Sequence, residues 1–119
     1  MRRIAVTGGR KFRDAELVDF ALSKALSKGP FVLIHGGASG ADNLANQWAT
    51  KNGIKTEVYR AKWGMYGKAA GPMRNRTMAK SGLNGCIAFP GGKATENMKQ
   101  ECRAMGVLVW EPKRDQGDE

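Results

Sequence analysis

The sequence predicts an α/β protein, a Rossmann-like, doubly wound parallel sheet of five strands with helices on both faces. Short, continuously apolar runs alternate with longer segments whose apolar residues recur at helical spacing, and a last apolar run ends the series. Strands that are apolar throughout are buried on both faces, as in parallel sheets covered by helices. Right-handed crossovers then favour the strand order 3-2-1-4-5.

The first half of the chain contains three predicted strands and two predicted helices. We expect strands over residues 3–7, 31–34 and 54–59. The third is the most polar, which places it nearer a sheet edge. Between the strands, apolar residues at i, i+3, i+4 and i+7 predict amphipathic helices over residues 14–28 and 41–52, the first with Asp14 as its N-cap.

The second half opens with an unusual loop. Residues 60–71 carry three glycines, several basic residues and two aromatics and are predicted to be irregular, which in a compact domain indicates a functional loop. Pro72 is expected to be the first residue of a helix that ends near Lys80. A strand over residues 86–89, a helix from about Glu96 to Met105 and a strand over residues 107–110 complete the pattern.

Composition fits one globular domain. The chain has 119 residues, 41% hydrophobic and 26% charged, and we expect a single domain over residues 1–112 with a polar tail over residues 113–119. No apolar run approaches the roughly 20 residues of a membrane helix, and residues 1–4 lead directly into a strand, so neither membrane contact nor a signal peptide is expected. Two cysteines without a CxxC motif and one histidine predict a cytoplasmic protein with no disulfide and no metal site.

The charge balance predicts an anionic partner. With 20 basic and 11 acidic residues, the chain has a net charge of +9. Such an excess favours a nucleotide or a nucleic acid. A basic surface with no specific partner is the plain alternative.

Four glycine-rich or basic segments are expected to converge, because the loops after parallel strands all lie at the carboxyl edge of the sheet. They are Gly8-Gly9-Arg10, Gly36 to Asp42, Trp63 to Arg76, and Pro90 to Thr95. In the order 3-2-1-4-5 the first and last of these flank the crevice between strands one and four. Paired glycines that end a strand and open a helix commonly present N–H groups to a phosphate. We therefore place the centre of a ligand site at Pro90 to Thr95.

The predicted ligand-binding residues come from all four segments. They are Gly8, Gly9, Arg10, Gly36, Gly37, Ser39, Gly40, Asp42, Arg74, Asn75, Gly91, Gly92, Lys93 and Thr95.

Several of these residues have a second interpretation. Ser39 and Asp42 also fit a capping box at the start of a helix; as a ligand contact, Asp42 would suit a ribose hydroxyl, since a carboxylate repels phosphate. Arg74 and Arg76 lie roughly 200° apart on a helix, so only one faces the crevice, and the pattern leaves open which. Trp63 and Tyr66 either stack on a base or hold the loop against the sheet.

Four motifs, in order, resemble a known family. They are Gly36 to Asp42, Lys62-Trp63 with Tyr66 to Pro72, Arg74-Asn75-Arg76 with Met78, and Ala88 to Thr95 with Met98. Together they resemble the YspA-type branch of the SLOG superfamily, Rossmann-like relatives of LOG and Smf/DprA proteins, over residues 3 to about 111. The resemblance implies a protein of bacteria or phages that senses or processes a nucleotide or nucleotide-derived ligand through Gly-Gly loops. Beyond that ligand, the sequence specifies no cofactor.

Two relatives imply alternative functions. LOG enzymes, which release the base from a nucleoside monophosphate, carry Pro-Gly-Gly-x-Gly-Thr-x-x-Glu with a catalytic glutamate; here Ala94 replaces a glycine and Met98 stands at the glutamate. Methionine cannot act as an acid or base, which leaves Asp42 as the catalytic candidate and leaves enzymatic activity open. DprA proteins resemble this chain at Arg74 to Arg76, which implies single-stranded DNA binding. A homodimer, with Arg74 or Arg76 reaching a second subunit, is also left open.

Overall fold

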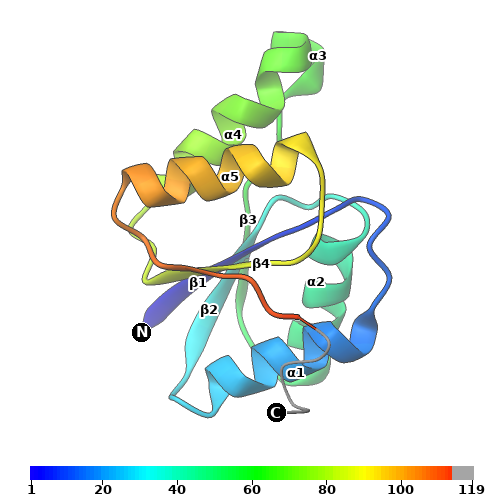
Figure 1. Ribbon diagram of the computed structural model, residues 1–119, viewed down its shortest axis with the longest axis vertical. Coiled ribbons are helices and arrows are strands. Elements are labelled where there is room, and N and C mark those ends of the chain that lie inside the picture. The colour runs from blue at the N-terminus through cyan, green and yellow to red at the C-terminus, as the bar shows by residue number, and fades with distance from the viewer. Residues whose placement is uncertain (114–119) are drawn as a thin grey trace.

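The computed structural model describes residues 1–113, so the predicted tail lies outside the described residues except for Lys113. Five parallel strands form one sheet in the order β3-β2-β1-β4-β5, which confirms the predicted topology (Figure 1). The strands are β1 (Arg2–Thr7), β2 (Phe31–His35), β3 (Thr56–Val58), β4 (Gly85–Ala88) and β5 (Val109–Trp110). As predicted, β3 lies at an edge of the sheet.

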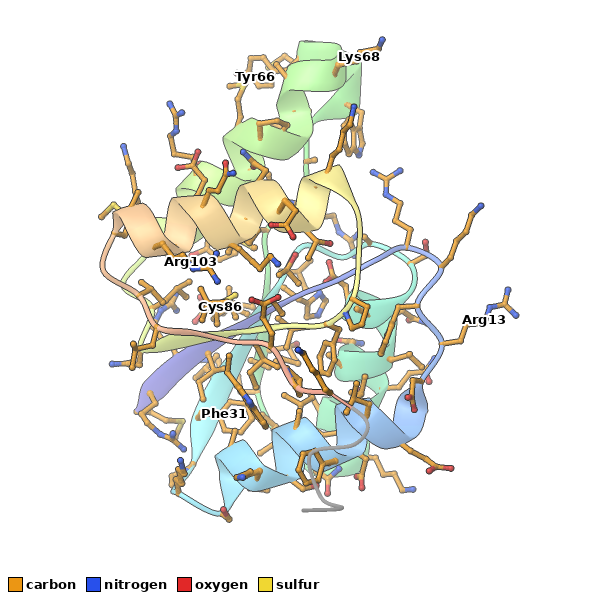
Figure 2. All side chains as sticks on the ribbon, in the orientation of Figure 1. Arg13, Phe31, Tyr66, Lys68, Cys86 and Arg103 are labelled. Atoms are coloured by element: carbon orange, nitrogen blue, oxygen red, sulfur yellow. The ribbon has the colours of Figure 1, made fainter. Side chains whose placement is uncertain are left out.

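Helices cover both faces of the sheet. The helices α1 (Ala15–Leu26) and α2 (Ala41–Lys51) pack on one face, and α4 (Ala70–Ala79) and α5 (Lys93–Ala104) pack on the other (Figure 1). Alternate strand residues face the two layers, since Ile4 and Val6 join the core under α1 and α2 whereas Ala5 joins the core under α4 and α5. Figure 2 shows Phe31 on the α1 side and Cys86 on the α5 side.

Local sequence signals explain α1 well. Asp14 is its N-cap, as predicted, with a carboxylate oxygen that accepts the Leu17 N–H at 3.1 Å. The predicted apolar stripe is buried at Val18, Ala21 and Leu22. The helix ends at Leu26, two residues before the predicted end, and the turn before β2 follows.

The segment before α4 differs from the prediction. Residues 60–71 are not irregular throughout, because they contain a short helix, α3 (Trp63–Tyr66), and a 3₁₀ turn, η1 (Gly67–Ala69), that runs into α4. Pro72 is therefore the third residue of α4 and not the first. It is tolerated there because its missing N–H falls within the first turn, where no intrahelical acceptor exists. Figure 1 shows α3 projecting from the body of the protein at the N-terminal end of α4.

The bounds of the last helix and the last strand also differ from the predicted ones. The helix α5 begins at Lys93, three residues before the prediction, with Gly92 as its N-cap. Met105 is half-exposed beyond its end and does not join the buried face formed by Met98 and Cys102. The strand β5 is confined to two residues. No helix in the described part of the chain is long and apolar enough to cross a membrane.

Candidate functional site at the carboxyl edge

Backbone groups of Gly9 join three of the predicted loops. Its N–H donates to the Pro90 carbonyl at 2.9 Å, and its carbonyl accepts the Ala41 N–H at 3.1 Å and the Phe12 N–H at 3.2 Å. The segments after β1, β2 and β4 therefore meet at the carboxyl edge, as the topology requires.

Three glycines allow this junction to close. A Cβ on Gly8 would lie 2.5 Å from the Cβ of Ala41, one on Gly91 would lie 2.7 Å from the Gly9 nitrogen, and one on Gly40 would overlap the Gly9 carbonyl oxygen. Gly40 also has φ of +77°, a region that favours glycine. At Gly40 and Gly91 the missing Cβ lets one backbone approach another, and at Gly8 it leaves room for the Cβ of Ala41.

Asp42 folds back onto the loop that precedes it. Its side chain is 7% exposed, and one carboxylate oxygen accepts the N–H groups of Gly36 at 3.0 Å and Ala38 at 3.2 Å. Burial raises the pKa of the Asp42 carboxyl, whereas the Ala38 N–H and the positive charge of Arg74 act in the opposite direction.

The predicted capping box is therefore wrong. Gly40 is the N-cap of α2, and Ser39 donates its hydroxyl to the Arg10 carbonyl at 3.3 Å. Asp42 does not cap Ser39, because the N–H groups of the loop already bind its carboxylate.

The Gly36 to Ala38 loop has no free N–H group among its three residues. The Gly37 N–H donates to His35 Nδ1 at 3.0 Å, while Asp42 accepts from the other two. Because Nδ1 is an acceptor, Nε2 carries the proton and donates to Asn46 Oδ1 at 3.0 Å. His35 is thus a buried, fully bonded structural histidine, and this loop does not offer these N–H groups to a phosphate.

Arg74 is the arginine that faces the carboxyl edge. Its Nη1 donates to the carbonyls of Gly36 at 2.9 Å and Tyr59 at 3.2 Å, which joins the ends of β2 and β3. Burial lowers the pKa of the Arg74 guanidinium, and Asp42 opposes that shift. Arg76 instead points to α5 and pairs with Glu101 at 3.6 Å.

Asn75 connects the two helices on that face. It is buried, and its Nδ2 donates to the Ala94 carbonyl at 3.2 Å and to Asn97 Oδ1 at 2.9 Å, both in α5. Its Oδ1 accepts from Nε of Arg74 at 3.0 Å. Asn75, predicted as a ligand contact, thus holds α4 to α5 and orients Arg74.

Arginines from three segments surround one cavity, which we call the arginine cavity. It has a volume of about 450 Å³ and is lined by Arg10, Gly36, Gly37, Ala38, Ser39, Arg60, Ala61, Trp63 and Arg74. The guanidinium of Arg10 lies 5.4 Å from the centre of the Trp63 ring, a cation–π contact. No acidic residue lines this cavity within residues 1–113, which therefore combines three positive charges with a polar loop.

The paired glycines Gly36 and Gly37 make room for two of these arginines. A Cβ on Gly36 would overlap the Arg74 guanidinium, and one on Gly37 would lie 2.7 Å from Nη1 of Arg60. Arg60 is not among the predicted ligand-binding residues. It follows the carboxyl end of β3 as Arg10 follows that of β1, and this position in the sequence is a signal that could have identified it.

A second cavity adjoins the first. This space, the helix cavity, has a volume of about 340 Å³ and is lined by Tyr59, Arg60, Lys62, Tyr66, Ala70, Met73, Arg74 and Thr77. Trp63 lines only the arginine cavity and Tyr66 only the helix cavity. The fold therefore separates the two predicted stacking residues.

The turn that begins α5 lines neither of these cavities. We call Pro90, Gly91 and Gly92 the Gly91 turn; its residues and Lys93 are exposed, Thr95 is buried, and none of them lines the arginine cavity or the helix cavity. Gly92 is the N-cap residue of α5 and has no side chain that could accept a hydrogen bond from the first turn. Met98 is fully buried in the core formed by Ala5, Ile34 and Cys86.

Comparison with known proteins identifies the family of this chain. The sequence profile of the YspA, cpYpsA-related SLOG family matches residues 2–66, which include β1, the Gly36 to Asp42 loop and Arg60. The chain belongs to this family. It is also similar to the gene 61 protein of Mycobacterium phage D29, with 38% identity over 118 residues that cover 92% of this chain and 94% of that protein.

A solved structure confirms the fold of this SLOG-family chain. The X-ray structure of TM1055 is similar with a TM-score of 0.72 and 19% identity, covering 92% of this chain and 72% of that one. The Rossmann-like architecture is therefore shared at low sequence identity. Within residues 1–113, no group of three or more His, Cys, Asp or Glu residues is arranged to hold a metal ion.

Proposed function

We propose that this protein binds a nucleotide or a nucleotide-derived anion in the arginine cavity, as a sensor or as a protein that processes that ligand. One observation carries the proposal: Arg10, Arg60 and Arg74 come from three segments and line one cavity that has no acidic lining residue among residues 1–113. Arginine pairs well with phosphate because its planar fork donates two parallel hydrogen bonds. Membership of a SLOG family agrees with a nucleotide-related ligand.

The arginines differ in how fully the protein already uses them. Arg74 donates to two backbone carbonyls and to Asn75, so its charge is fixed in place. The Arg60 side chain has no hydrogen bond or ion pair with the described residues, and the Arg10 guanidinium has only its contact with Trp63 among them. Two guanidinium groups thus remain available to an anion beside a third that is held rigidly.

Hydrolysis of an N-glycosidic bond has less support. The position of the LOG glutamate is Met98, which is buried in the core. Asp42 does not line the cavity and is occupied by the N–H groups of Gly36 and Ala38. Neither position offers a carboxylate to a bound nucleotide.

The N-terminus of α5 is a second candidate position for a phosphate. Gly92 leaves its first turn without a side-chain cap, and Lys93 is exposed beside it. Helix N-termini favour anions through their unpaired N–H groups. Substituting Lys93 or Arg60 would therefore show whether a phosphate binds at the start of α5 or in the arginine cavity.

The experiment is a thermal-shift screen with nucleoside mono-, di- and triphosphates and dinucleotides, followed by calorimetric titration of every hit. We expect at least one nucleotide to raise Tm, and Arg60→Ala to weaken its binding about tenfold, the loss of one charged hydrogen-bonding group. Arg13→Ala is the matched control, because Figure 2 shows Arg13 directed away from the protein. If no nucleotide binds, or if both variants bind as the wild type does, the proposal is wrong.

Single-stranded nucleic acid is the remaining candidate, supported by the net charge of +9 and the exposed aromatics of α3. An affinity for single-stranded DNA that falls steeply with salt would support it. An affinity insensitive to salt would exclude it.

A further inference from the structure

The arginine cavity and the helix cavity share two walls. Arg60 and Arg74 line both spaces. A ligand that occupies both cavities would therefore lie against the side chains of Arg60 and Arg74. The negatively charged part of such a ligand would lie beside them.

The two cavities offer different chemistry on either side of this boundary. Beyond Arg60 and Arg74, the arginine cavity continues to Arg10 and the polar loop Gly36 to Ser39. The helix cavity instead continues to the side chains of Tyr66, Met73 and Ala70, and also includes Lys62. The ligand would thus be anionic beside the arginines and would carry a flat, largely apolar group beside Tyr66 and Met73.

Tyr66 and Met73 are suited to a nucleobase. They are 44% and 43% exposed, and the Tyr66 side chain has no hydrogen bond with the described residues. An aromatic ring and a polarizable thioether both pack well on a flat aromatic group. In Figure 2, the side chains of Tyr66 and Lys68 extend to opposite sides of the projecting segment.

Thr77 adds a polar group to the same space. Its hydroxyl donates to the Met73 carbonyl at 3.1 Å, so the oxygen keeps lone pairs that can accept a hydrogen bond from a base amino group. Lys62 lines the cavity as well and adds a positive charge to those of Arg60 and Arg74. The helix cavity therefore combines the apolar surface of Tyr66 and Met73 with a hydroxyl and basic side chains, and small-molecule sites commonly mix apolar and polar groups in this way.

The size and charge of the arginine cavity favour more than one phosphate. A water occupies about 30 Å³, so a single phosphate group, the size of a few waters, fills only part of 450 Å³. Four basic residues, Arg10, Arg60, Arg74 and Lys62, line the two cavities together, and Asp42 opposes one of these charges through Arg74. The three positive charges that remain exceed the two or so negative charges of one phosphate monoester. A second phosphate would improve both the fit and the charge balance.

Building on the proposed function, we propose that the ligand is a nucleoside diphosphate or a molecule that contains one. Its base lies in the helix cavity against Tyr66 and Met73. Its diphosphate runs past Arg74 and Arg60 towards Arg10.

The test compares probes that fill one cavity or both. Calorimetric titrations of the full chain use inorganic pyrophosphate, which fits the arginine cavity alone, together with the mono- and diphosphates of adenosine, guanosine, cytidine and uridine. We expect at least one nucleoside diphosphate to bind about tenfold more tightly than both its monophosphate and pyrophosphate. Base stacking alone is worth about that factor.

Variants then test which end of the ligand lies in which cavity. Tyr66→Ala is expected to weaken binding of that diphosphate about tenfold and to leave pyrophosphate binding within about twofold, whereas Arg10→Ala is expected to weaken both. Met73→Ala is the second variant of the helix cavity. Met65→Ala is the control, since Met65 lies in the same short helix as Tyr66, is strongly exposed and lines neither cavity.

The outcomes separate this inference from the proposed function. If Arg10→Ala weakens the nucleotide while Tyr66→Ala and Met73→Ala do not, the base lies elsewhere; this inference fails and the proposed function stands. The same holds if mono- and diphosphates bind equally. If no nucleotide binds at all, both fail.

Discussion

The Gly91 turn and the arginine cavity both lie at the carboxyl edge of the sheet, but their glycines have different neighbours. A Cβ on Gly91 would meet the backbone of Gly9 and the side chain of Thr95. A Cβ on Gly36 or Gly37 would meet the guanidinium of Arg74 or Arg60. In the first region glycine lets two loops touch, and in the second it lets two positive charges reach a loop.

This difference changes how each region would hold an anion. The Gly91 turn offers the uncapped start of α5 and so acts through the backbone. In the arginine cavity the N–H groups of the loop are already bonded, so binding depends on side chains. Substitutions can therefore separate the two regions.

The largest expected effect comes from placing the glutamate of the LOG motif at position 98, in the helix that follows the Gly91 turn. Met98→Glu buries a carboxyl group in a fully apolar core, so we expect a loss of about 4 kcal/mol in the free energy of unfolding. Urea denaturation measures it, with the exposed Gln100→Glu on the same helix as the control. We also expect no base release from nucleoside monophosphates. A variant as stable as the wild type that releases base would make the Gly91 turn the reactive region.

The next effect tests the backbone junction that precedes α2. Gly40→Ala adds a Cβ that would lie 2.5 Å from the Arg10 carbonyl carbon at φ of +77°, and we expect it to lower the free energy of unfolding by about 3 kcal/mol. Gly53→Ala is the control, since Gly53 has φ of +68° with no atom within 4 Å of the added Cβ, and it should cost only about 1 kcal/mol. Equal losses would show that conformational strain alone explains Gly40.

A smaller effect tests the link between the two regions. Asn75→Ala removes the bonds from α4 to Ala94 and Asn97 of α5 and the support of Arg74, so we expect a loss of about 2 kcal/mol in stability and weaker nucleotide binding. Arg76→Ala is the control, because its exposed contact with Glu101 should contribute less than about 1 kcal/mol. Unchanged nucleotide affinity in Asn75→Ala would show that Arg74 does not depend on this link.

The smallest effect decides which region holds the phosphate. Lys93→Ala is expected to change nucleotide affinity by less than about twofold, because an exposed charge away from the ligand contributes little at physiological salt. Titration alongside Arg60→Ala measures the difference directly. If Lys93→Ala weakens binding as much as Arg60→Ala does, the phosphate lies at the start of α5.

The fold was largely predictable, and the candidate site only in part. The strand order, the N-cap at Asp14 and the edge position of β3 followed from apolar periodicity and chain topology. The short helix α3 was missed because four residues are too few to show a period. Arg74 and Arg76 could not be distinguished, because a helical pattern gives their angular separation but not the direction of the core.

The sequence by itself determined that this chain forms a parallel sheet and that its glycine-rich loops meet at one edge, because both follow from local periodicity and the handedness of crossovers. Tertiary structure alone decided what those loops do there. The bond from Arg74 to Gly36 joins residues 38 positions apart, and Asp42 turns to bind the loop before it instead of capping its own helix. Such contacts depend on how side chains of distant segments are oriented after packing, which no local pattern encodes.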